Sequence, residues 1–193
     1  SIGLLGNLFS RLGSSCMPFL VPLLLQVSLN FSPFRAGMMM IPVAVAGMLV
    51  KRVTTPLITR YGYRRVLVTN TALVGITMAS FAFISPSQPL WLHIVQLAVF
   101  GAVNSMQFTA MNTVTLRDLE PNMASSGNSL LSMVQMLAMS LGVAVAASVL
   151  ARCTAYFAPP GAAQTLSAFD ANFVVMGLVT MASAWIFWQL EHD

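Results

Sequence analysis

Six long apolar segments, separated by short stretches of turn-forming or charged residues, account for most of the chain. They cover about residues 3–28, 34–54, 66–84, 90–114, 122–150 and 171–190. Each has about the 20 apolar residues that a helix needs to cross a bilayer. Ser32-Pro33 has the pattern of a helix start, with a Ser cap and Pro in the first turn, while the stretch from Ser85 to Pro89 ends the third segment. The pattern predicts six membrane-spanning helices.

The composition supports a bilayer rather than water as the solvent. Apolar residues make up 57% of the 193 residues and charged residues 7%, and the mean hydropathy is +0.80, whereas a soluble domain is about one quarter charged. An ordinary soluble enzyme, a disordered chain and a secreted disulfide scaffold are therefore excluded. The two cysteines, Cys16 and Cys153, are far apart and form no metal or redox motif. The fold class expected is an all-α membrane protein.

The start of the chain does not resemble a signal peptide. There is no initiator Met, and the first apolar stretch exceeds 20 residues with Arg11 inside it, which differs from the short apolar core of a cleaved signal. We therefore expect the sequence to be a piece of a longer protein.

The basic residues are distributed unevenly between the two ends of the expected spans. Five of the nine cations fall between residues 51 and 65, and Arg117 follows the fourth span on the same side. The opposite side has Arg35 and Arg152. The positive-inside rule then places both termini in the cytoplasm and the loop at about 151–170 in the periplasm. A cation cluster beside a span indicates topology rather than nucleic-acid binding.

The six segments divide into two halves, 1–84 and 90–193. The second and fifth segments both end in basic residues, Lys51-Arg52 and Arg152, on opposite sides of the membrane. This arrangement fits two inverted three-helix repeats, which are common in transporters.

Polar residues gather along stripes on three of the expected helices. The fourth helix has a stripe within an arc of about 80°, and Asn112 lies off it; the fifth has one within about 100°. The third and sixth helices carry mostly Ser and Thr and are expected to face lipid. The stripe on the fourth helix is His93, Gln96, Phe100, Asn104, Gln107 and Met111, that on the fifth is Ser125, Asn128, Ser132, Gln135, Met139 and Gly142, and the first helix offers Asn7, Arg11, Ser15, Pro18 and Pro22.

Two interpretations of the stripes remain open. Amide side chains can join helices through interhelical hydrogen bonds, or they can line a substrate cavity. Two stripes that mix amides with Met and Phe favour the cavity, because these side chains adapt to bulky, varied, amphipathic molecules. Arg11 either extends toward the cytoplasm or pairs with an acid or substrate across the cavity. All five acidic residues lie at helix ends or in loops, so a proton-carrying carboxylate would have to come from outside this chain.

The segment from Thr59 to Leu67 resembles the loop signature of the major facilitator superfamily, G-x-x-x-D-R-x-G-R-R. Arg60, Gly62, Arg64 and Arg65 match it, whereas Thr55 and Thr59 stand at the Gly and Asp positions. The resemblance implies that the four matching residues act in gating on the cytoplasmic side.

A second set of residues is similar to the fourteen-helix drug:proton antiporter branch of that superfamily. It consists of Arg11, Pro22 with Gln26, Ser32-Pro33 with Ala36-Gly37, Pro42, and Asn128 with the stretch at Gly142. The resemblance covers the whole chain as the last six of fourteen helices. It implies an inner-membrane exporter with alternating access, driven by proton influx without another cofactor, and an N-terminal half as partner.

The sequence therefore predicts the C-terminal six-helix half of a proton-coupled multidrug efflux transporter, and not an enzyme. Two alternatives stay open: a major facilitator carrier for a specific metabolite or anion, with Arg11 as anchor, and a six-helix structural or assembly module. The expected partners are amphipathic small molecules and membrane lipid, not nucleic acid. The expected substrate-cavity residues are Arg11, Gln26, Gln96, Phe100, Asn104, Gln107, Met111, Asn128, Gln135 and Met139.

Overall fold

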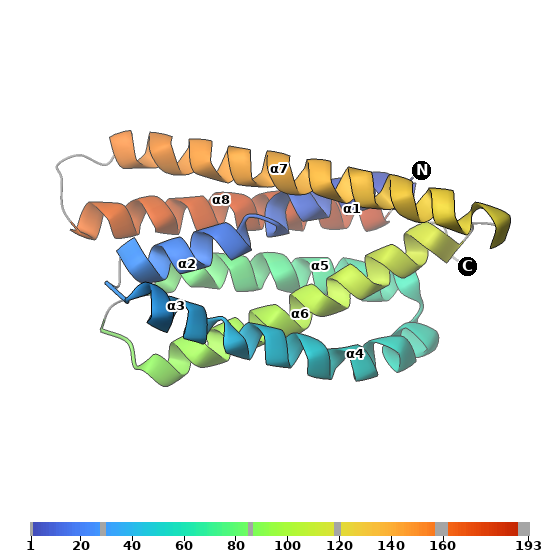
Figure 1. Ribbon diagram of the computed structural model, residues 1–193, viewed down its shortest axis with the longest axis horizontal. Helices are drawn as coiled ribbons and strands as arrows, with labels where there is room; N and C mark the ends of the chain where they lie inside the picture. Colours follow the sequence, from blue (N-terminus) through green and yellow to red (C-terminus); the bar gives the residue numbers. More distant parts are fainter. Residues whose placement is uncertain (1, 28–29, 85–86, 118–120, 157–161, 189–193) are drawn as a thin grey trace.

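A computed structural model describes residues 2–27, 30–84, 87–117, 121–156 and 162–188, and these residues form helices joined by short connections without any strand (Figure 1). Within them, six segments are long and apolar enough to cross a membrane. The helices are α1 (Ile2–Ser14), α2 (Met17–Val27), α3 (Pro33–Met39), α4 (Ile41–Tyr61), α5 (Tyr63–Ser80), η1 (Phe81–Phe83), α6 (Leu90–Arg117), η2 (Pro121–Met123), α7 (Ala124–Tyr156) and α8 (Ala162–Trp188). The all-α six-span fold expected from the sequence is confirmed.

The first span is two helices rather than the single helix expected over 3–28. The chain turns at Ser15 and Cys16, between α1 and α2. Pro18 has no N–H to donate to the Ser14 carbonyl, and its ring collides with that carbonyl in a continuous helix. The Cys16 thiol instead donates to the Gly13 carbonyl at 2.9 Å. Arg11 therefore lies in the last turn of a helix that ends inside the membrane span.

The second span begins as the sequence predicts but extends further. The Ser32 hydroxyl accepts a hydrogen bond from the Arg35 N–H at 3.3 Å, and Pro33 is the first residue of α3. However, α4 continues to Tyr61, and Gly62 alone separates it from α5. The basic cluster expected in a loop thus lies on the last turns of α4 and the first turn of α5.

The last two spans are longer than the sequence suggested. The fifth continues as α7 to Tyr156, and the sixth begins as α8 at Ala162, so the loop expected at about 151–170 is confined to the few residues between them. Those residues, 157–161, lie outside the described residues.

The same helix–helix contacts recur in the two halves of the chain. In this comparison α1, α4 and α5 of the first half correspond to α6, α7 and α8 of the second half. The pair α1 and α7 maps onto α6 and α4, and the pair α1 and α8 maps onto α6 and α5. The pair α7 and α8 maps onto α4 and α5, and the close pair α5 and α8 maps onto itself. Figure 1 shows α1 and α6, which open the two halves, running in opposite directions. Packing and direction together give the two inverted repeats.

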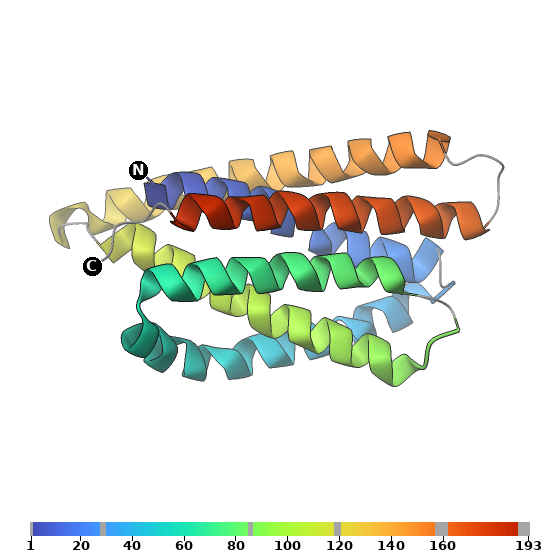
Figure 2. The ribbon, with the colours of Figure 1, turned by 180° about the vertical axis from the view of Figure 1, so that it is seen from behind.

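The bundle has two distinct sides. In Figure 2, α5 and α8 lie side by side in front, with α1 and α6 behind them. Along the middle of α5 and α8, large apolar side chains are exposed, among them Leu73, Ile76, Val175 and Leu178, as contact with lipid requires. The opposite side, turned toward the viewer in Figure 1, is flanked by α7 and α4, the two least buried spans.

Candidate functional site

A hydrogen-bonded cluster of buried polar side chains joins three helices at the centre of the bundle. The Gln107 amide of α6 donates to the Thr71 hydroxyl of α5 at 2.6 Å and to the Ser10 hydroxyl of α1 at 3.2 Å. The Asn70 amide donates to the Gln107 Oε1 at 2.8 Å and to the Val103 carbonyl at 3.0 Å. All four side chains are buried. Such a cluster holds helices together because each polar group finds its partner inside the protein.

Arg11 lies beside this cluster on the neighbouring position of α1. Its Cζ is 4.2 Å from the centre of the Phe108 ring on α6, a cation–π contact. Its Nε and Nη2 are buried and have no hydrogen-bond partner among the described residues. A buried, uncompensated guanidinium is costly, so these two nitrogens require a partner that the described part of this chain does not supply.

A continuous row of side chains leads from Arg11 across α6 to α7. Phe108 and Asn112 are four residues apart and share one face of α6. The Gln135 amide of α7 donates to the Asn112 Oδ1 at 2.7 Å, and Met139 lies one turn further along α7. Phe108 and Met139 are both exposed, at 41% and 43%. We call Arg11, Phe108, Asn112, Gln135 and Met139 the Arg11 row.

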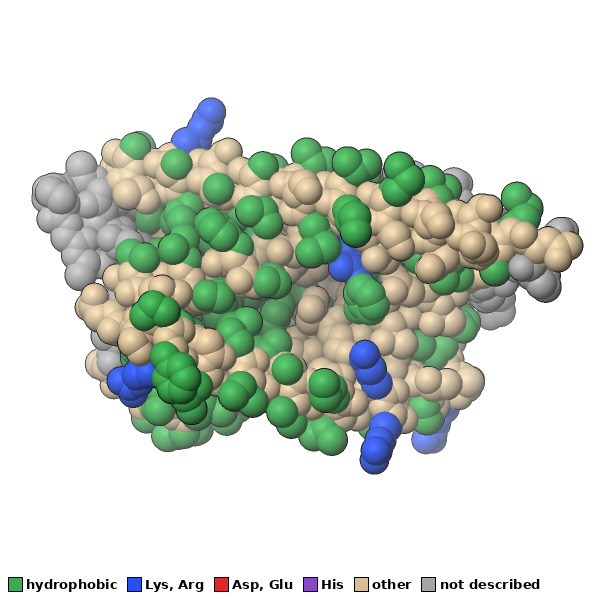
Figure 3. Space-filling model, viewed as in Figure 1, with side chains coloured by type: hydrophobic (Ala, Val, Ile, Leu, Met, Phe, Trp, Pro, Cys, Tyr) green, Lys and Arg blue, Asp and Glu red, His purple; other side chains and the backbone are tan. Residues whose placement is uncertain are grey.

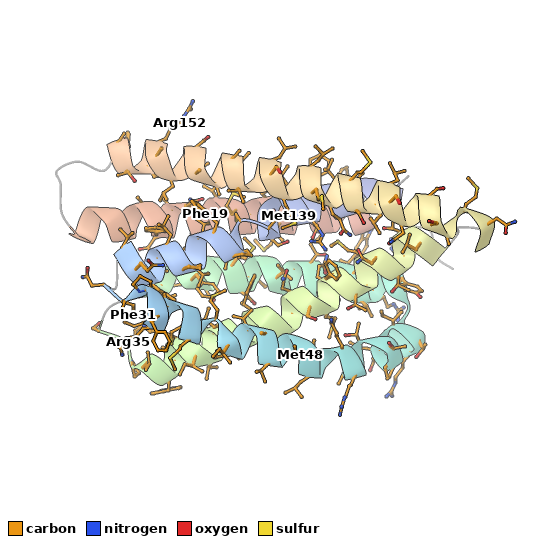
Figure 4. All side chains as sticks on the ribbon, in the orientation of Figure 1. Phe19, Phe31, Arg35, Met48, Met139 and Arg152 are labelled. Carbon is orange, nitrogen blue, oxygen red and sulfur yellow. The ribbon has the colours of Figure 1, made fainter. Side chains whose placement is uncertain are left out.

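Met139 of the Arg11 row lies on the side of the bundle that Figure 1 faces. Figure 4 shows Met139 on α7 near α1, Phe19 on α2, and Met48 on α4 at the opposite rim. Figure 3 shows apolar side chains spread over this whole face, and every charged side chain visible there is basic. Methionine and aromatic side chains with a few amides form a surface that can adapt to varied apolar ligands.

Several residues predicted for the cavity are packed inside the bundle instead. Phe100 lies in the main core, edge-on to Phe81 with ring centres 6.0 Å apart. Met111 lies in a second core with Ile58 and Leu67. Together with Gln107, they occupy the face of α6 that packs against neighbouring helices rather than an open face.

The other predicted residues are spread along the bundle. The Gln96 amide donates to the Ser80 carbonyl of α5 at 3.0 Å. Gln26 is exposed on the last turn of α2, Asn128 is exposed on the first turns of α7, and Asn104 is half-buried on α6. Of the ten predicted cavity residues, the structure brings Arg11, Gln135 and Met139 together in one row.

Sequence reasoning missed Phe108 and Asn112. The six-residue stripe on the fourth helix directed attention to the face that packs against α5, while Asn104, Phe108 and Asn112 form a row of their own at a spacing of four residues. An amide has the same preference for a helix interface as for a cavity. The spacing of four residues from Asn104 through Phe108 to Asn112 was the sequence signal that could have indicated this second face of α6.

The residues expected to gate the transporter surround the turn between α4 and α5. Gly62 has φ +80° and ψ 157°, a region essentially open only to glycine. Arg60 is exposed in the last turn of α4, and Arg65 is exposed in the first turn of α5. The Cζ of Arg64 lies 5.0 Å from the centre of the Trp188 ring at the end of α8.

Comparison with known proteins identifies the class to which this six-span membrane bundle belongs. Residues 2–143 match the family model described as Major Facilitator Superfamily. The chain belongs to the major facilitator superfamily, whose members are membrane carriers, and it is a multi-pass protein of the bacterial inner membrane.

Three relatives that match the whole chain are provisionally named multidrug resistance protein MdtD. The proteins of Escherichia fergusonii and Escherichia coli strain K12 are each 40% identical to it over 195 residues. The protein of Pectobacterium carotovorum strain PC1 is 39% identical over 193 residues. This confirms the resemblance to drug transporters seen in the sequence. The chain spans 41% of the length of these relatives.

Proposed function

We propose that this chain is the C-terminal six-helix half of a multidrug exporter that works by alternating access. Its relatives are longer and are named for multidrug resistance, and its two inverted repeats provide the architecture for alternating exposure of a site. The N-terminal half would cover the side on which α4 and α7 remain exposed. The complete protein would confer antibiotic resistance by expelling amphipathic small molecules.

The observation that carries this proposal is the Arg11 row. It combines an exposed aromatic ring, two amides and an exposed methionine with a guanidinium whose Nε and Nη2 are buried without a partner among the described residues, and these groups come from three different helices. A site with one charge, few hydrogen-bonding groups and adaptable apolar walls suits substrates of varied shape. Three of the remaining predicted cavity residues support the row: Gln107 holds α1 and α5 against α6, and Phe100 and Met111 pack in the cores of the bundle.

The energy source in this proposal is the proton gradient, and no other cofactor is required. No bond is made or broken by the Arg11 row, so the chain acts as a carrier and not as an enzyme. Asp170 is the one acidic residue among the described residues, and it lies on α8, away from the row. The carboxylate that binds and releases the proton would therefore be provided by the other half.

The proposed orientation places both termini in the cytoplasm. The ends of α4 and α6 and the start of α5 carry six cations, whereas the opposite end of the bundle carries Arg35 and Arg152. Figure 1 shows the start of α1 and the end of α8 at the same end as the cation-rich one. The positive-inside rule assigns that end to the cytoplasm. A fluorescent-protein fusion at the C-terminus should fluoresce, and a periplasmic phosphatase fusion there should be inactive.

A carrier for one specific metabolite or anion is the second candidate, and Arg11 favours it. A guanidinium with free donors binds carboxylate or phosphate groups well. In that carrier, Arg11→Gln would abolish transport, and only anions would compete with the substrate for transport. In a multidrug exporter, neutral and cationic dyes would be transported.

The test is dye efflux by the full-length protein in cells that lack their other pumps, with and without a protonophore. The proposal predicts efflux that collapses with the protonophore and falls in Gln135→Ala. Ser140→Ala is the matched control, because Ser140 is exposed on α7 and its hydroxyl donates within its own helix, to the Met136 carbonyl at 2.9 Å. Efflux restricted to anions would establish the second candidate. Absence of transport for every compound tested would favour a structural module.

A further inference from the structure

A groove of about 680 Å³ lies outside the Arg11 row, between α4, α5 and α6. Its walls are mainly apolar: Val50 and Leu57 come from α4, Leu73 from α5, and Ala102 and Met106 from α6. Figure 2 shows α6 crossing obliquely between α5 in front and α4 behind. The groove is therefore an apolar channel between three membrane helices.

One end of the groove is basic and aromatic. Arg64 and Arg65 from the first turn of α5 line this end, together with Tyr61 from the last turn of α4 and Trp188 from the end of α8. The Arg64 guanidinium stacks on the Trp188 ring at 5.0 Å. Tyrosine, tryptophan and arginine at the ends of membrane helices mark the level of lipid headgroups.

The two arginines have no acidic partner in the part of the chain that the structure describes. Asp170 is its one carboxylate, and it lies near the start of α8, whereas Trp188 marks the end of that helix. Thr59 occupies the position at which the superfamily signature has Asp, and its hydroxyl donates to the Pro56 carbonyl at 2.9 Å. The basic end of the groove therefore carries two positive charges that no carboxylate among the described residues neutralises.

The length of the groove matches one leaflet of a bilayer. Val50 and Tyr61 are eleven residues apart on α4, which corresponds to roughly 16 Å at 1.5 Å per residue. Half of the hydrocarbon thickness of about 30 Å is about 15 Å. A chain that starts beside the arginines would thus reach about the middle of the membrane.

We propose that this groove binds an anionic phospholipid from the leaflet at the cation-rich end of the bundle. The headgroup phosphate accepts hydrogen bonds from Arg64 and Arg65, and an acyl chain lies along the groove. Basic pockets between membrane helices select anionic headgroups by charge, and the apolar wall selects a lipid over a free anion. The bound lipid contacts α4 and α5 on both sides of the Gly62 turn. This lipid site does not depend on the proposed export function. A negative result for either proposal therefore leaves the other one standing.

Native mass spectrometry of the full-length protein tests the proposal. The protein in detergent is titrated with phosphatidylglycerol or phosphatidylcholine of the same acyl chains, and bound lipid is counted. We expect preferential retention of phosphatidylglycerol. Near a membrane surface each arginine contributes about fivefold to the affinity for an anionic lipid, so Arg64→Gln/Arg65→Gln should bind phosphatidylglycerol about 25-fold more weakly.

Three further variants keep the outcome unambiguous. Lys51→Gln/Arg52→Gln removes the same charge from the last half of α4, outside the groove lining, and should retain binding. Arg64→Lys/Arg65→Lys should retain most of it. Thr69 lines the groove at an exposed position, so Thr69→Phe places a ring in the groove. This variant should weaken the binding of both lipids alike.

Four results would overturn the proposal. The first is equal retention of the two lipids, and the second is an unchanged preference in Arg64→Gln/Arg65→Gln. The third is displacement of phosphatidylglycerol by inorganic phosphate, which would show a small-anion site. The fourth is a gain of lipid binding in Glu191→Gln/Asp193→Asn, which would show that the chain's own carboxylates occupy the arginines.

Discussion

Gly75 on α5 and Gly177 on α8 face each other so closely that a Cβ atom on either residue would lie 2.9 Å from the carbonyl oxygen of the other. The two residues belong to the third and sixth spans, which correspond to each other in the two repeats. Close approach of backbones through small residues is a principal source of helix association in a membrane, where no hydrophobic driving force exists between helices. On the side of the bundle away from the Arg11 row, α5 and α8 are therefore packed backbone against backbone at these two glycines.

Gly177→Ala should destabilise the protein by about 1–3 kcal/mol, because the added methyl group meets backbone atoms that cannot move aside. These are the Gly75 carbonyl and the Ala79 nitrogen, which would lie 2.9 Å and 3.2 Å from the new Cβ. Thermal unfolding in detergent measures the effect. Gly37→Ala is the control, since nothing lies within 4 Å of a Cβ at that position. Equal melting temperatures for the two variants would contradict the packing described.

Gly62→Ala should cost about 1–3 kcal/mol for a different reason, namely backbone conformation. A Cβ at Gly62 would meet nothing within 4 Å, as at Gly37, but only Gly62 has a positive φ, +80°. The comparison of Gly62→Ala with Gly37→Ala thus isolates the conformational term. An unfolding free energy unchanged in Gly62→Ala would show that the turn between α4 and α5 is not as described.

The sequence allowed the six spans and their order to be predicted, because a run of about 20 apolar residues leaves no alternative to a spanning helix. It did not allow the breaks and ends to be placed. Pro18 and Pro22 are both in the first span, yet the helix breaks before Pro18 and continues through Pro22. Proline is tolerated inside membrane helices when neighbours satisfy the freed groups, and only tertiary packing decides where that happens.

Gln107→Leu should lower stability by about 1–3 kcal/mol, because it leaves the Thr71 and Ser10 hydroxyls without their partner in a dry interior. Transport per folded molecule should stay within about twofold of the parent, since Gln107 is 1% exposed and contacts no open surface. Thermal unfolding and efflux normalised to folded protein measure the two effects. A normal melting temperature with a loss of efflux would instead place Gln107 in the substrate site.

Gln135→Ala should show the opposite behaviour. Gln135 is half-buried and donates to Asn112 at the edge of the open face, so its loss should change stability by less than about 1 kcal/mol. The apparent affinity for at least some dyes should fall. Concentration dependence of efflux, together with unfolding in detergent, checks this, and parallel losses in both properties would contradict it.

Comparison of Gln107 with Gln135 explains how much of the site was predictable. Both lie on polar stripes at helical spacing, and the sequence indicated that each faces something polar. It could not indicate whether that is another helix or a cavity, because both environments satisfy an amide equally well. The structure separates the two residues through their partners. Gln107 is surrounded by Asn70, Thr71 and Ser10 in the interior, whereas Gln135 donates to Asn112 at the edge of the open face.

Arg11 and Phe108 should be energetically coupled. The ring centre lies 4.2 Å from the guanidinium Cζ, and a half-exposed cation–π pair is worth about 0.5–2 kcal/mol. A double-mutant cycle with Arg11→Met and Phe108→Leu should give a coupling energy of that size. Arg11→Met alone should unfold no more easily than the parent, because it removes a buried charge that lacks two partners. A coupling energy near zero would contradict the contact.

In the proposed transport mechanism, the Arg11 row lines a cavity that opens alternately to the two sides of the membrane. The most direct test is cysteine labelling of Phe108→Cys in the full-length protein, with Cys16 and Cys153 replaced by Ser and Leu73→Cys as the control on the lipid side. Under conditions that favour the outward-open and the inward-open states, labelling at position 108 should change by about tenfold or more in opposite directions from the two sides, while position 73 should remain constant. Equal reactivity at position 108 in both states would contradict alternating access at the Arg11 row.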